Sequence, residues 1–214
     1  MDELIQITLL SLGVSGIATA ISLLIGLPLG TVLALSVFRS RGIVLSVVNT
    51  GMALPPVVAG LAIALLLWRS GPLGDLNLIY TPSAIILAEV VIATPVILGL
   101  SAAGIGQLDP RLQVQLQGLG ASRMQTVFWL WREARLSLLA ALMAGFGSVI
   151  SEVGAAMMVG GNISGQTRVL TTAMVLDVGR GNFGAAIQLA GILLALAFLV
   201  NGILTWAQQS GKRH

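Results

Sequence analysis

The chain has 214 residues, of which 56% are hydrophobic and only 9% are charged. Soluble domains carry about 25% charged residues, and a mean hydropathy of +0.97 exceeds what a soluble core of this size needs. The expected solvent is therefore a lipid bilayer. The net charge is only +3, and the basic residues stand at the ends of apolar runs without forming a stripe, which argues against nucleic acid as a partner.

Residue types that support several kinds of chemistry are missing. The chain has no cysteine, which excludes disulfides, thiolate zinc sites and cysteine nucleophiles, and its one histidine, His214, is the last residue. The first residues, MDELIQ, are acidic where a signal peptide is basic, and the apolar run that follows is too long for a signal peptide. We therefore expect a retained first membrane span.

Five apolar runs are each long enough to cross a bilayer, which takes about 20 helical residues. They are Ile7–Phe38, Ile43–Trp68, Leu78–Ile105, Leu136–Val159 and Ala185–Ala207. The polar gaps between them are short except for Gly106–Arg135 and Gly160–Gly184, which are the candidate working parts. The composition predicts an all-α polytopic membrane protein with five transmembrane helices, organised as one transmembrane domain over residues 1–214.

The basic residues predict the orientation in the membrane. Eight of them fall in alternate gaps on one side, and three fall on the other. The first group is Arg39, Arg41, Arg111, Arg123, Arg132, Arg135, Lys212 and Arg213; the second is Arg69, Arg168 and Arg180. Cytoplasmic loops carry the excess of Lys and Arg, so the C-terminus is expected in the cytoplasm and the N-terminus outside.

Prolines and small residues interrupt the apolar runs. Pro28, the pair Pro55 and Pro56, and Pro95 each remove a backbone donor and are expected to kink their helices. Lipid tolerates such breaks only where neighbouring helices or a water-filled cavity satisfy the freed carbonyls, which favours a transporter or channel over a kinked bundle without transport. The stretch GLPLG, Gly26 to Gly30, has the spacing of close helix packing, either within one subunit or across a dimer.

The segment Gly106–Arg135 is too polar to span and predicts two short helices. Asp109-Pro110 is typical of a helix start, and Leu112, Leu116 and Leu119 repeat at helical spacing. GLGAS then breaks the helix, and Ser122 can cap a second one. Such a pair either lies on the membrane surface or docks into a groove of a partner protein.

This segment resembles the cytoplasmic "EAA" loop of prokaryotic ABC importer membrane subunits, which presents a coupling helix to an ATPase. The motif glycine is matched by Gly120 with its neighbours Leu119, Ala121 and Ser122, whereas Val114-Gln115-Leu116 stands where E-A-A is expected. The resemblance implies that residues 106–135 form the coupling segment. Its candidate ATPase contacts are Leu112, Leu116, Leu119, Gly120, Ala121 and Ser122.

A second stretch, GFGSVISEVGAAMMVGGNISGQTRVLTTAM, is similar to the matching region of tungstate-uptake permeases, relatives of the molybdate and sulfate permeases. The resemblance implies a MetI-like ABC permease fold in the prokaryotic inner membrane. It also implies a homodimer, two cytoplasmic ATP-binding subunits and an extracytoplasmic substrate-binding protein. The chain itself has one lysine and no GxxxxGK[ST] motif, so it is predicted to be no enzyme and to hold no cofactor, with ATP and Mg²⁺ bound by the partner ATPase.

Glu152 lies near the end of an apolar run, where a charge is costly and needs a reason. It can anchor a gate by hydrogen bonding or pairing, with Arg168 as the candidate partner; it can line the path; or it can carry a proton. Glu89 is the other intramembrane acid, and a hydrogen bond to a neighbouring helix is its simplest role. A proton-coupled carrier that uses both acids is the rival to an ABC importer.

The polar residues after Glu152 suit an oxyanion such as tungstate, molybdate or sulfate, because glycine-rich turns expose backbone N–H groups and threonines add hydroxyls. The alternatives are a flexible outer loop and a contact with the binding protein. The candidate gate or pathway residues are Glu152, Gly160, Gly161, Asn162, Ser164, Thr167, Arg168, Thr171 and Thr172.

Overall fold

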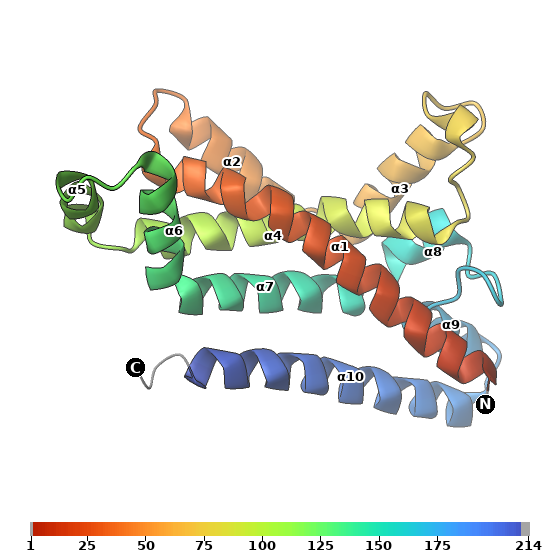
Figure 1. Cartoon of the computed structure of the whole chain (residues 1–214). Helices are drawn as coiled ribbons and strands as arrows, with labels where there is room; N and C mark the ends of the chain where they lie inside the picture. The colour runs from red at the N-terminus through yellow and green to blue at the C-terminus, as the bar shows by residue number, and fades with distance from the viewer. Residues whose placement is uncertain (1, 211–214) are drawn as a thin grey trace.

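A computed structural model describes residues 2–210, and this part of the chain is helical without strands (Figure 1). The elements are α1 (Asp2–Leu35), α2 (Arg41–Met52), α3 (Pro56–Leu67), the 3-10 turn η1 (Gly74–Leu76), α4 (Pro82–Gly106), α5 (Pro110–Gly118), α6 (Arg123–Glu133), α7 (Arg135–Ile150), α8 (Gly154–Gly160), α9 (Leu170–Gly179) and α10 (Phe183–Ser210). Lys212, Arg213 and His214 lie outside the described residues.

Helices α1 and α4 form the centre of the bundle and approach closely through glycines of α1. A Cβ atom built on Gly26 lies 3.1 Å from the Leu98 backbone nitrogen, and one on Gly30 lies 2.7 Å from the Leu98 carbonyl oxygen. The GLPLG stretch therefore serves packing within one subunit, which is one of the two roles predicted for it.

Three helices are unbroken and apolar enough to cross a membrane: α1, α4 and α10. The remaining apolar runs are bent. Helices α2 and α3 meet at 96° and diverge as a V in Figure 1, and α6 meets α7 at 74°. If each bent pair is one span, the chain has up to five spans, as the sequence predicted.

The expected proline kink is confirmed at Pro55 and Pro56, where the helical backbone is broken between α2 and α3. Pro28 lies inside α1 and Pro95 inside α4, and both helices continue through them. A single proline removes one backbone bond, and the long α1–α4 contact holds the remaining turns in line. At Pro55 the next residue is also proline, and Pro56 starts α3 as its first residue.

The run Leu136–Val159 is not one continuous span. Helix α7 ends at Ile150, Ser151 to Val153 are not helical, and α8 starts at Gly154. The gap Gly160–Gly184, predicted to be polar loop, contains the ten-residue helix α9 and the first residues of α10.

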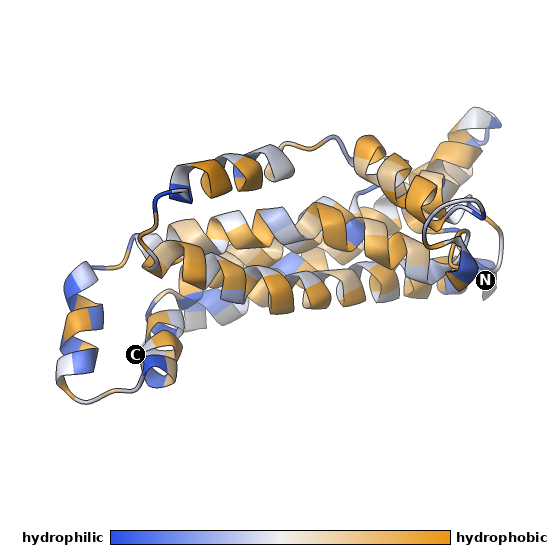
Figure 2. Cartoon of the chain, turned by 90° about the horizontal axis from the view of Figure 1, so that it is seen from above, coloured by the Kyte–Doolittle hydropathy of each residue, from blue (hydrophilic) through white to orange (hydrophobic). Residues whose placement is uncertain are grey.

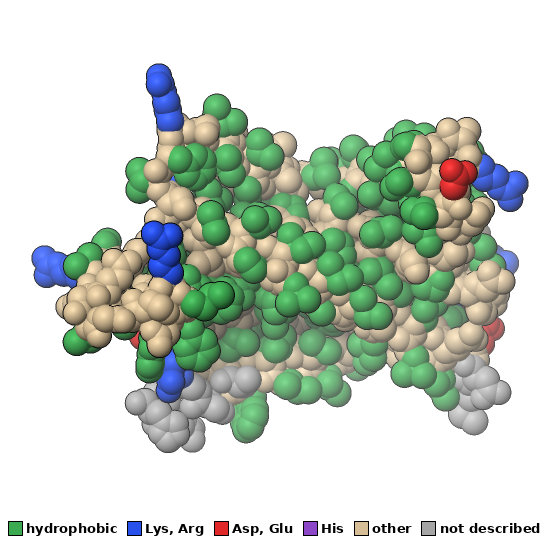
Figure 3. Space-filling model, turned by 45° about the horizontal axis from the view of Figure 1, so that its top comes forward, with side chains coloured by type: hydrophobic (Ala, Val, Ile, Leu, Met, Phe, Trp, Pro, Cys, Tyr) green, Lys and Arg blue, Asp and Glu red, His purple; other side chains and the backbone are tan. Residues whose placement is uncertain are grey.

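Charged side chains gather at the two ends of the molecule on the face shown in Figure 3, and the middle of that face carries apolar side chains. The hydropathy colouring of Figure 2 likewise runs apolar along the bundle, with hydrophilic residues mostly toward its ends. We call the end with the α1 start, η1 and the α8–α9 loop the N-terminal end; the opposite end carries α5 and α6 (Figure 1). This distribution fits a bilayer around the middle of the bundle.

Candidate functional site

Glu152 lies in the break between α7 and α8 and is 9% exposed. Its side-chain Oε1 accepts a hydrogen bond from the Ala155 backbone N–H at 2.9 Å. Its backbone carbonyl accepts one from Thr171 Oγ1 at 2.7 Å. The residue therefore caps the first turn of α8 and ties the break to α9, which satisfies backbone groups that the interruption of the helix leaves free.

A second buried carboxylate lies on the same small cavity as Glu152, and this cavity is too narrow for a water molecule. Glu89 of α4 is 3% exposed, and Ser15 of α1 donates to its Oε1 at 3.5 Å. Ser11, one turn earlier, accepts from the Leu170 N–H at 2.8 Å, and these residues line the cavity together with Thr171. The contact with Ser15 confirms the predicted hydrogen bond between Glu89 and a neighbouring helix. Four segments, α1, α4, the α7–α8 break and α9, thus meet around polar groups inside the bundle.

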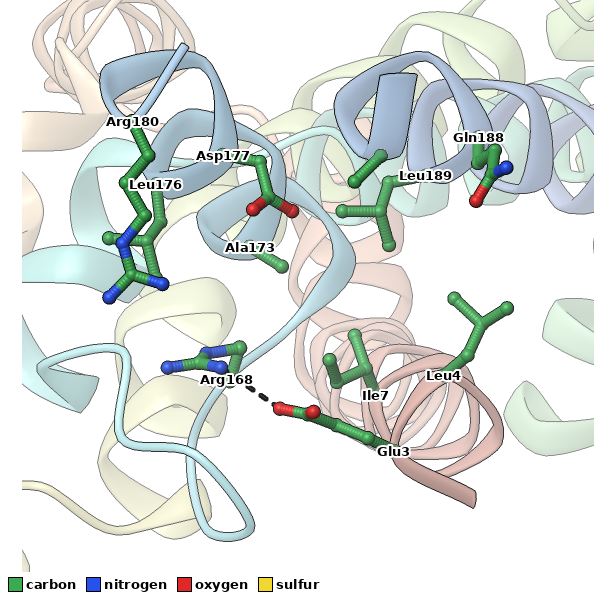
Figure 4. A pocket seen from close by; sticks show the side chains of 11 residues that line it. Glu3, Leu4, Ile7, Arg168, Ala173, Leu176, Asp177, Arg180, Gln188 and Leu189 are labelled. Atoms are coloured by element: carbon green, nitrogen blue, oxygen red, sulfur yellow. Dashed lines mark hydrogen bonds and ion pairs between the residues drawn. The ribbon is translucent and has the colours of Figure 1, made fainter. Parts of the chain in front are cut away.

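Arg168 does not pair with Glu152, so that hypothesis is wrong. Its Nη1 lies 3.0 Å from Oε1 of Glu3, near the start of α1 (Figure 4). The same Glu3 oxygen accepts from Ser164 Oγ at 2.8 Å, and Gln6 Nε2 donates to the Gly165 carbonyl at 3.1 Å. These bonds fasten the α8–α9 loop to the N-terminal end of α1. Sequence proximity suggested Glu152, whereas the loop turns Arg168 toward the other side.

The threonines among the predicted pathway residues are buried and bonded within the chain. Thr167 Oγ1 donates to the Gly160 carbonyl at 2.5 Å and accepts from the Ile163 N–H at 3.0 Å. Thr172 Oγ1, in the first turn of α9, accepts from the N–H of Val169, the residue just before the helix, at 3.1 Å. Thr171 bonds to Glu152, as described above. These hydroxyls therefore hold the loop in shape.

The glycines and Asn162 give this loop its tight turns. Gly161, Asn162 and Gly165 have positive φ angles of 69°, 52° and 74°, a region that favours glycine and asparagine. A Cβ on Gly160 would lie 2.8 Å from the Ile85 side chain, and one on Gly161 would lie 2.8 Å from the Tyr80 ring. The Tyr80 N–H also donates to the Val159 carbonyl at 2.8 Å, so the segment before α4 is bound to the last turn of α8.

The bend between α2 and α3 brings non-helical backbone into a predicted span, and none of the predicted site residues lies there. Ala53 to Pro55 are not in either helix, and apolar side chains on both sides of the bend are exposed, among them Met52, Val57 and Val58. Non-helical backbone at membrane depth is tolerated only where protein covers it or water reaches it. In the sequence, the double proline indicated where the helix breaks, but it did not indicate the direction in which α3 bends away from α2.

The segment Gly106–Arg135, the predicted coupling segment, is a helical corner at the end opposite to the start of α1 (Figure 1). Asp109 Oδ1 accepts from the Arg111 N–H at 2.9 Å at the start of α5, as predicted. Gly120 has a φ of 86°, and Ser122 then starts α6 with reciprocal bonds to Gln125 at 2.8 and 3.3 Å. The glycine break and the Ser122 cap are thus confirmed.

Apolar side chains of this corner point away from the bundle. Leu119 is 86% exposed and Met124 is 80% exposed; Val114 and Phe128 are exposed too, and α5 has no buried residue. Leu112, Leu116 and Ala121 are half-buried, while Gly120 and Ser122 are exposed. An exposed apolar group on a polar corner marks an interaction surface. The anchor of the corner is Trp131, whose Nε1 donates to Thr31 Oγ1 of α1 at 2.8 Å.

A bundle of bent and unbroken apolar spans with buried acids and an exposed helical corner defines a membrane transport subunit. Residues 26–212 match the family described as binding-protein-dependent transport system inner membrane component. The chain belongs to this family of ABC transporter permeases and is a multi-pass membrane protein.

Several curated relatives cover almost the whole chain. It is 39% identical over 208 residues to the probable anion ABC transporter permease protein of Haloferax volcanii, covering 95% of this chain and 90% of that protein. It is 36% identical over 207 residues to the tungstate uptake system permease protein TupB of Peptoclostridium acidaminophilum, covering 97% and 91%. The molybdenum transport system permease protein ModB of Escherichia coli K12 is 28% identical over 211 residues, covering 94% and 92%.

Solved structures confirm the fold. An inward-facing structure of the MetNI methionine ABC transporter matches with a TM-score of 0.81 at 18% identity, over 100% of this chain and 98% of that one. The chain therefore has the MetI-like permease fold that the sequence predicted.

Proposed function

We propose that this chain is the membrane subunit of an ATP-driven oxyanion importer, with tungstate as the first candidate substrate and molybdate as the second. The observation that carries the proposal is the 36% identity, over 97% of the chain, to a tungstate uptake permease. A molybdenum permease is 28% identical over a similar length, and a sulfate permease is 29% identical over 180 residues. The ranking of the anions follows the share of this chain that each relative covers, which is 97%, 94% and 79% for the tungstate, molybdenum and sulfate permeases.

The energy for transport comes, in this proposal, from a separate ATPase that binds ATP and Mg²⁺ and docks on the α5–α6 corner. The exposed Leu119 supports this assignment because an apolar side chain on a polar corner gains free energy when a partner's groove covers it. The Gly106–Arg135 end is then cytoplasmic. Two copies of the chain, two ATPase subunits and an extracytoplasmic binding protein complete the assembly.

Two consecutive helices, joined at a bend of 74°, lead from the corner to the break at Glu152. Helix α6 is followed directly by α7, whose 16 residues end at Ile150 next to the break. At 1.5 Å per residue, α7 is a rod about 24 Å long. A displacement of α6 by the ATPase therefore moves the α7–α8 break, where Glu152 and Thr171 join α8 to α9. We assign the gate to this break and to the bend between α2 and α3.

Elemental analysis of cells tests the proposed substrate. Tungsten and molybdenum are measured in cells with and without this chain at low, equal supply of both anions. Loss of tungsten accumulation alone supports tungstate, and loss of both metals widens the substrate class to include molybdate. If neither metal changes, the oxyanion assignment is wrong.

A proton-coupled carrier is the alternative, because Glu89 and Glu152 line one buried cavity. The same uptake assay separates the two. With ATP held constant, a protonophore leaves the uptake of an ATP-driven importer intact, whereas it abolishes the uptake of a proton-coupled carrier.

A further inference from the structure

A cavity of about 370 Å³ opens at the N-terminal end of the bundle, between the start of α1, helix α9 and the start of α10 (Figure 4). Its floor is apolar and includes the buried side chains of Ile7 and Leu189. Four charged residues line the rest: Glu3, Arg168, Asp177 and Arg180. The cavity is within the size range of small-ligand sites, which begins at about 300 Å³.

The charges around the cavity balance, but their hydrogen-bonding capacity is only partly used. Arg168 and Glu3 form an ion pair on the cavity wall. Within residues 2–210, the Asp177 carboxylate and the Arg180 guanidinium have no hydrogen bond or ion pair, and the buried Nε of Arg168 has no acceptor. Asp177 also lies in the last turn of α9, where the helix dipole disfavours an acid. The cavity therefore offers two cationic donors and one carboxylate acceptor.

This combination selects against a simple anion and against a simple cation. A tungstate or molybdate dianion at the arginines would also meet Glu3 and Asp177, and a lone cation at Asp177 would meet Arg180. A zwitterion with separate phosphate and ammonium groups meets partners of opposite sign at both ends. Arginine forks suit phosphate oxygens, and a carboxylate suits a primary ammonium that can donate hydrogen bonds.

The position of the cavity indicates that such a ligand is a lipid. Helices α1 and α10 both begin here as unbroken spans, so the cavity lies near the level of the lipid headgroups. Only 11% of the spanning window of α10 is buried, which makes α10 a peripheral helix. Leu4, on the cavity wall, and Ile187, on the first turns of α10, are exposed apolar side chains beside acyl chains.

We propose that this cavity binds the headgroup of a zwitterionic phospholipid with a primary ammonium, such as phosphatidylethanolamine. The phosphate contacts Arg180 and the exposed part of the Arg168 guanidinium, and the ammonium contacts Asp177. The bound lipid closes the gap between α9 and α10 on one side and α1 on the other. This site is separate from the α7–α8 break and does not depend on which substrate the chain transports.

Native mass spectrometry of the full chain, purified in detergent and delipidated, tests the proposal with three added lipids that share the same acyl chains. Phosphatidylethanolamine is expected to bind about five- to tenfold more tightly than phosphatidylcholine, because methylation removes the ammonium donors that Asp177 accepts. Phosphatidylglycerol, which has no ammonium, is expected to bind as weakly as phosphatidylcholine. Equal binding of all three lipids, or tightest binding of phosphatidylglycerol, overturns the proposal.

Two variants locate the site, and a third serves as the matched control. Asp177→Asn is expected to abolish the preference for phosphatidylethanolamine over phosphatidylcholine, and Arg180→Gln is expected to weaken the binding of every phospholipid. Asp75→Asn removes an exposed acid in η1 at the same end of the bundle and outside the cavity, so it is expected to change nothing. The side chains of Asp177 and Arg180 make no hydrogen bond or ion pair within the described residues, so both variants are expected to fold. An unchanged lipid preference in Asp177→Asn contradicts the assignment.

Discussion

Glycine 30 is the residue at which the close contact between α1 and α4 is most sensitive. A Cβ there would lie 2.7 Å from a backbone oxygen of α4, which cannot move as a side chain tip does. We expect Gly30→Ala to lower the free energy of unfolding by about 1–3 kcal/mol. Gly13→Ala, in the same helix with nothing within 4 Å of its Cβ, is the matched control and is expected to be neutral or stabilising. Thermal unfolding of the purified chain in detergent compares the two, and equal melting temperatures contradict the packing argument.

Substitutions of Glu152 can distinguish a role of its hydrogen bond in anchoring the α7–α8 break from a role of its charge. Its carboxylate accepts one hydrogen bond, from the Ala155 N–H, and a glutamine oxygen can accept the same bond. We expect Glu152→Gln to keep most of the uptake of the parent chain and Glu152→Ala to lose most of it. In Glu152→Ala the unpaired buried N–H costs about 1–3 kcal/mol at the break. Uptake measured at matched protein levels checks this; abolished uptake in Glu152→Gln instead assigns a charge or proton role to the acid.

At the scale of the helices, the apolar runs were predictable because membrane insertion depends on length and hydropathy, which the sequence states directly. The 96° angle between α2 and α3 was not predictable from the sequence, because tertiary contacts set it. Gly60 lies directly against Ala155 of α8, and Gly51 lies against Pro95 of α4. Helix α9 was missed because its threonines made it look like a loop. In the fold those hydroxyls bond to Val169 and Glu152, so the polar first turn of α9 is buried.

At the scale of the helices, the α5–α6 corner of the predicted site is confirmed as a structure, and the role of the α8–α9 loop stays a prediction. Local rules located the corner of α5 and α6, since Asp109, Gly120 and Ser122 act through neighbours two to three residues away. The partner of Arg168 was missed because Glu3 is 165 residues distant in the sequence. The pathway role of the α8–α9 loop stays a prediction. Because its threonines are already bonded within the chain, the donors that this loop can offer an anion, within the described residues, are chiefly the backbone N–H groups of Asn162, Ser164 and Gly165.

The α5–α6 corner is the element with which the proposed ATPase contact can be broken. We expect Leu119→Asp to reduce uptake about tenfold or more, because the partner's groove would have to desolvate a charge. ATP hydrolysis by the assembled transporter is expected to persist without transport. Val37→Asp is the control, since Val37 is 99% exposed in the segment between α1 and α2, outside the corner. Unchanged uptake in Leu119→Asp removes Leu119 from the coupling contact.

For the whole molecule, the charge distribution and the fold agree on which loops share a side. Arg39 and Arg41 lie at the end that carries α5 and α6, and Arg69, Arg168 and Arg180 lie at the N-terminal end, as the predicted grouping requires. An odd number of crossings then puts the start of α1 and the end of α10 on opposite sides of the membrane. Which side faces the cytoplasm follows only from the excess of arginine at the α5–α6 end.

The absence of cysteine makes that orientation directly measurable, because a single introduced thiol has no background. Ser40 and Ser70 are both exposed residues in turns, and they lie at opposite ends of the bundle. Serine to cysteine exchanges an oxygen for a sulfur, so Ser40→Cys and Ser70→Cys are expected to fold and transport as the parent chain does. In intact cells, a membrane-impermeant maleimide is expected to label Ser70→Cys and to leave Ser40→Cys unlabelled until the membrane is made permeable. The reverse pattern places the α5–α6 corner outside the cell, where no ATP-hydrolysing partner could reach it, and so contradicts both the orientation and the coupling proposal.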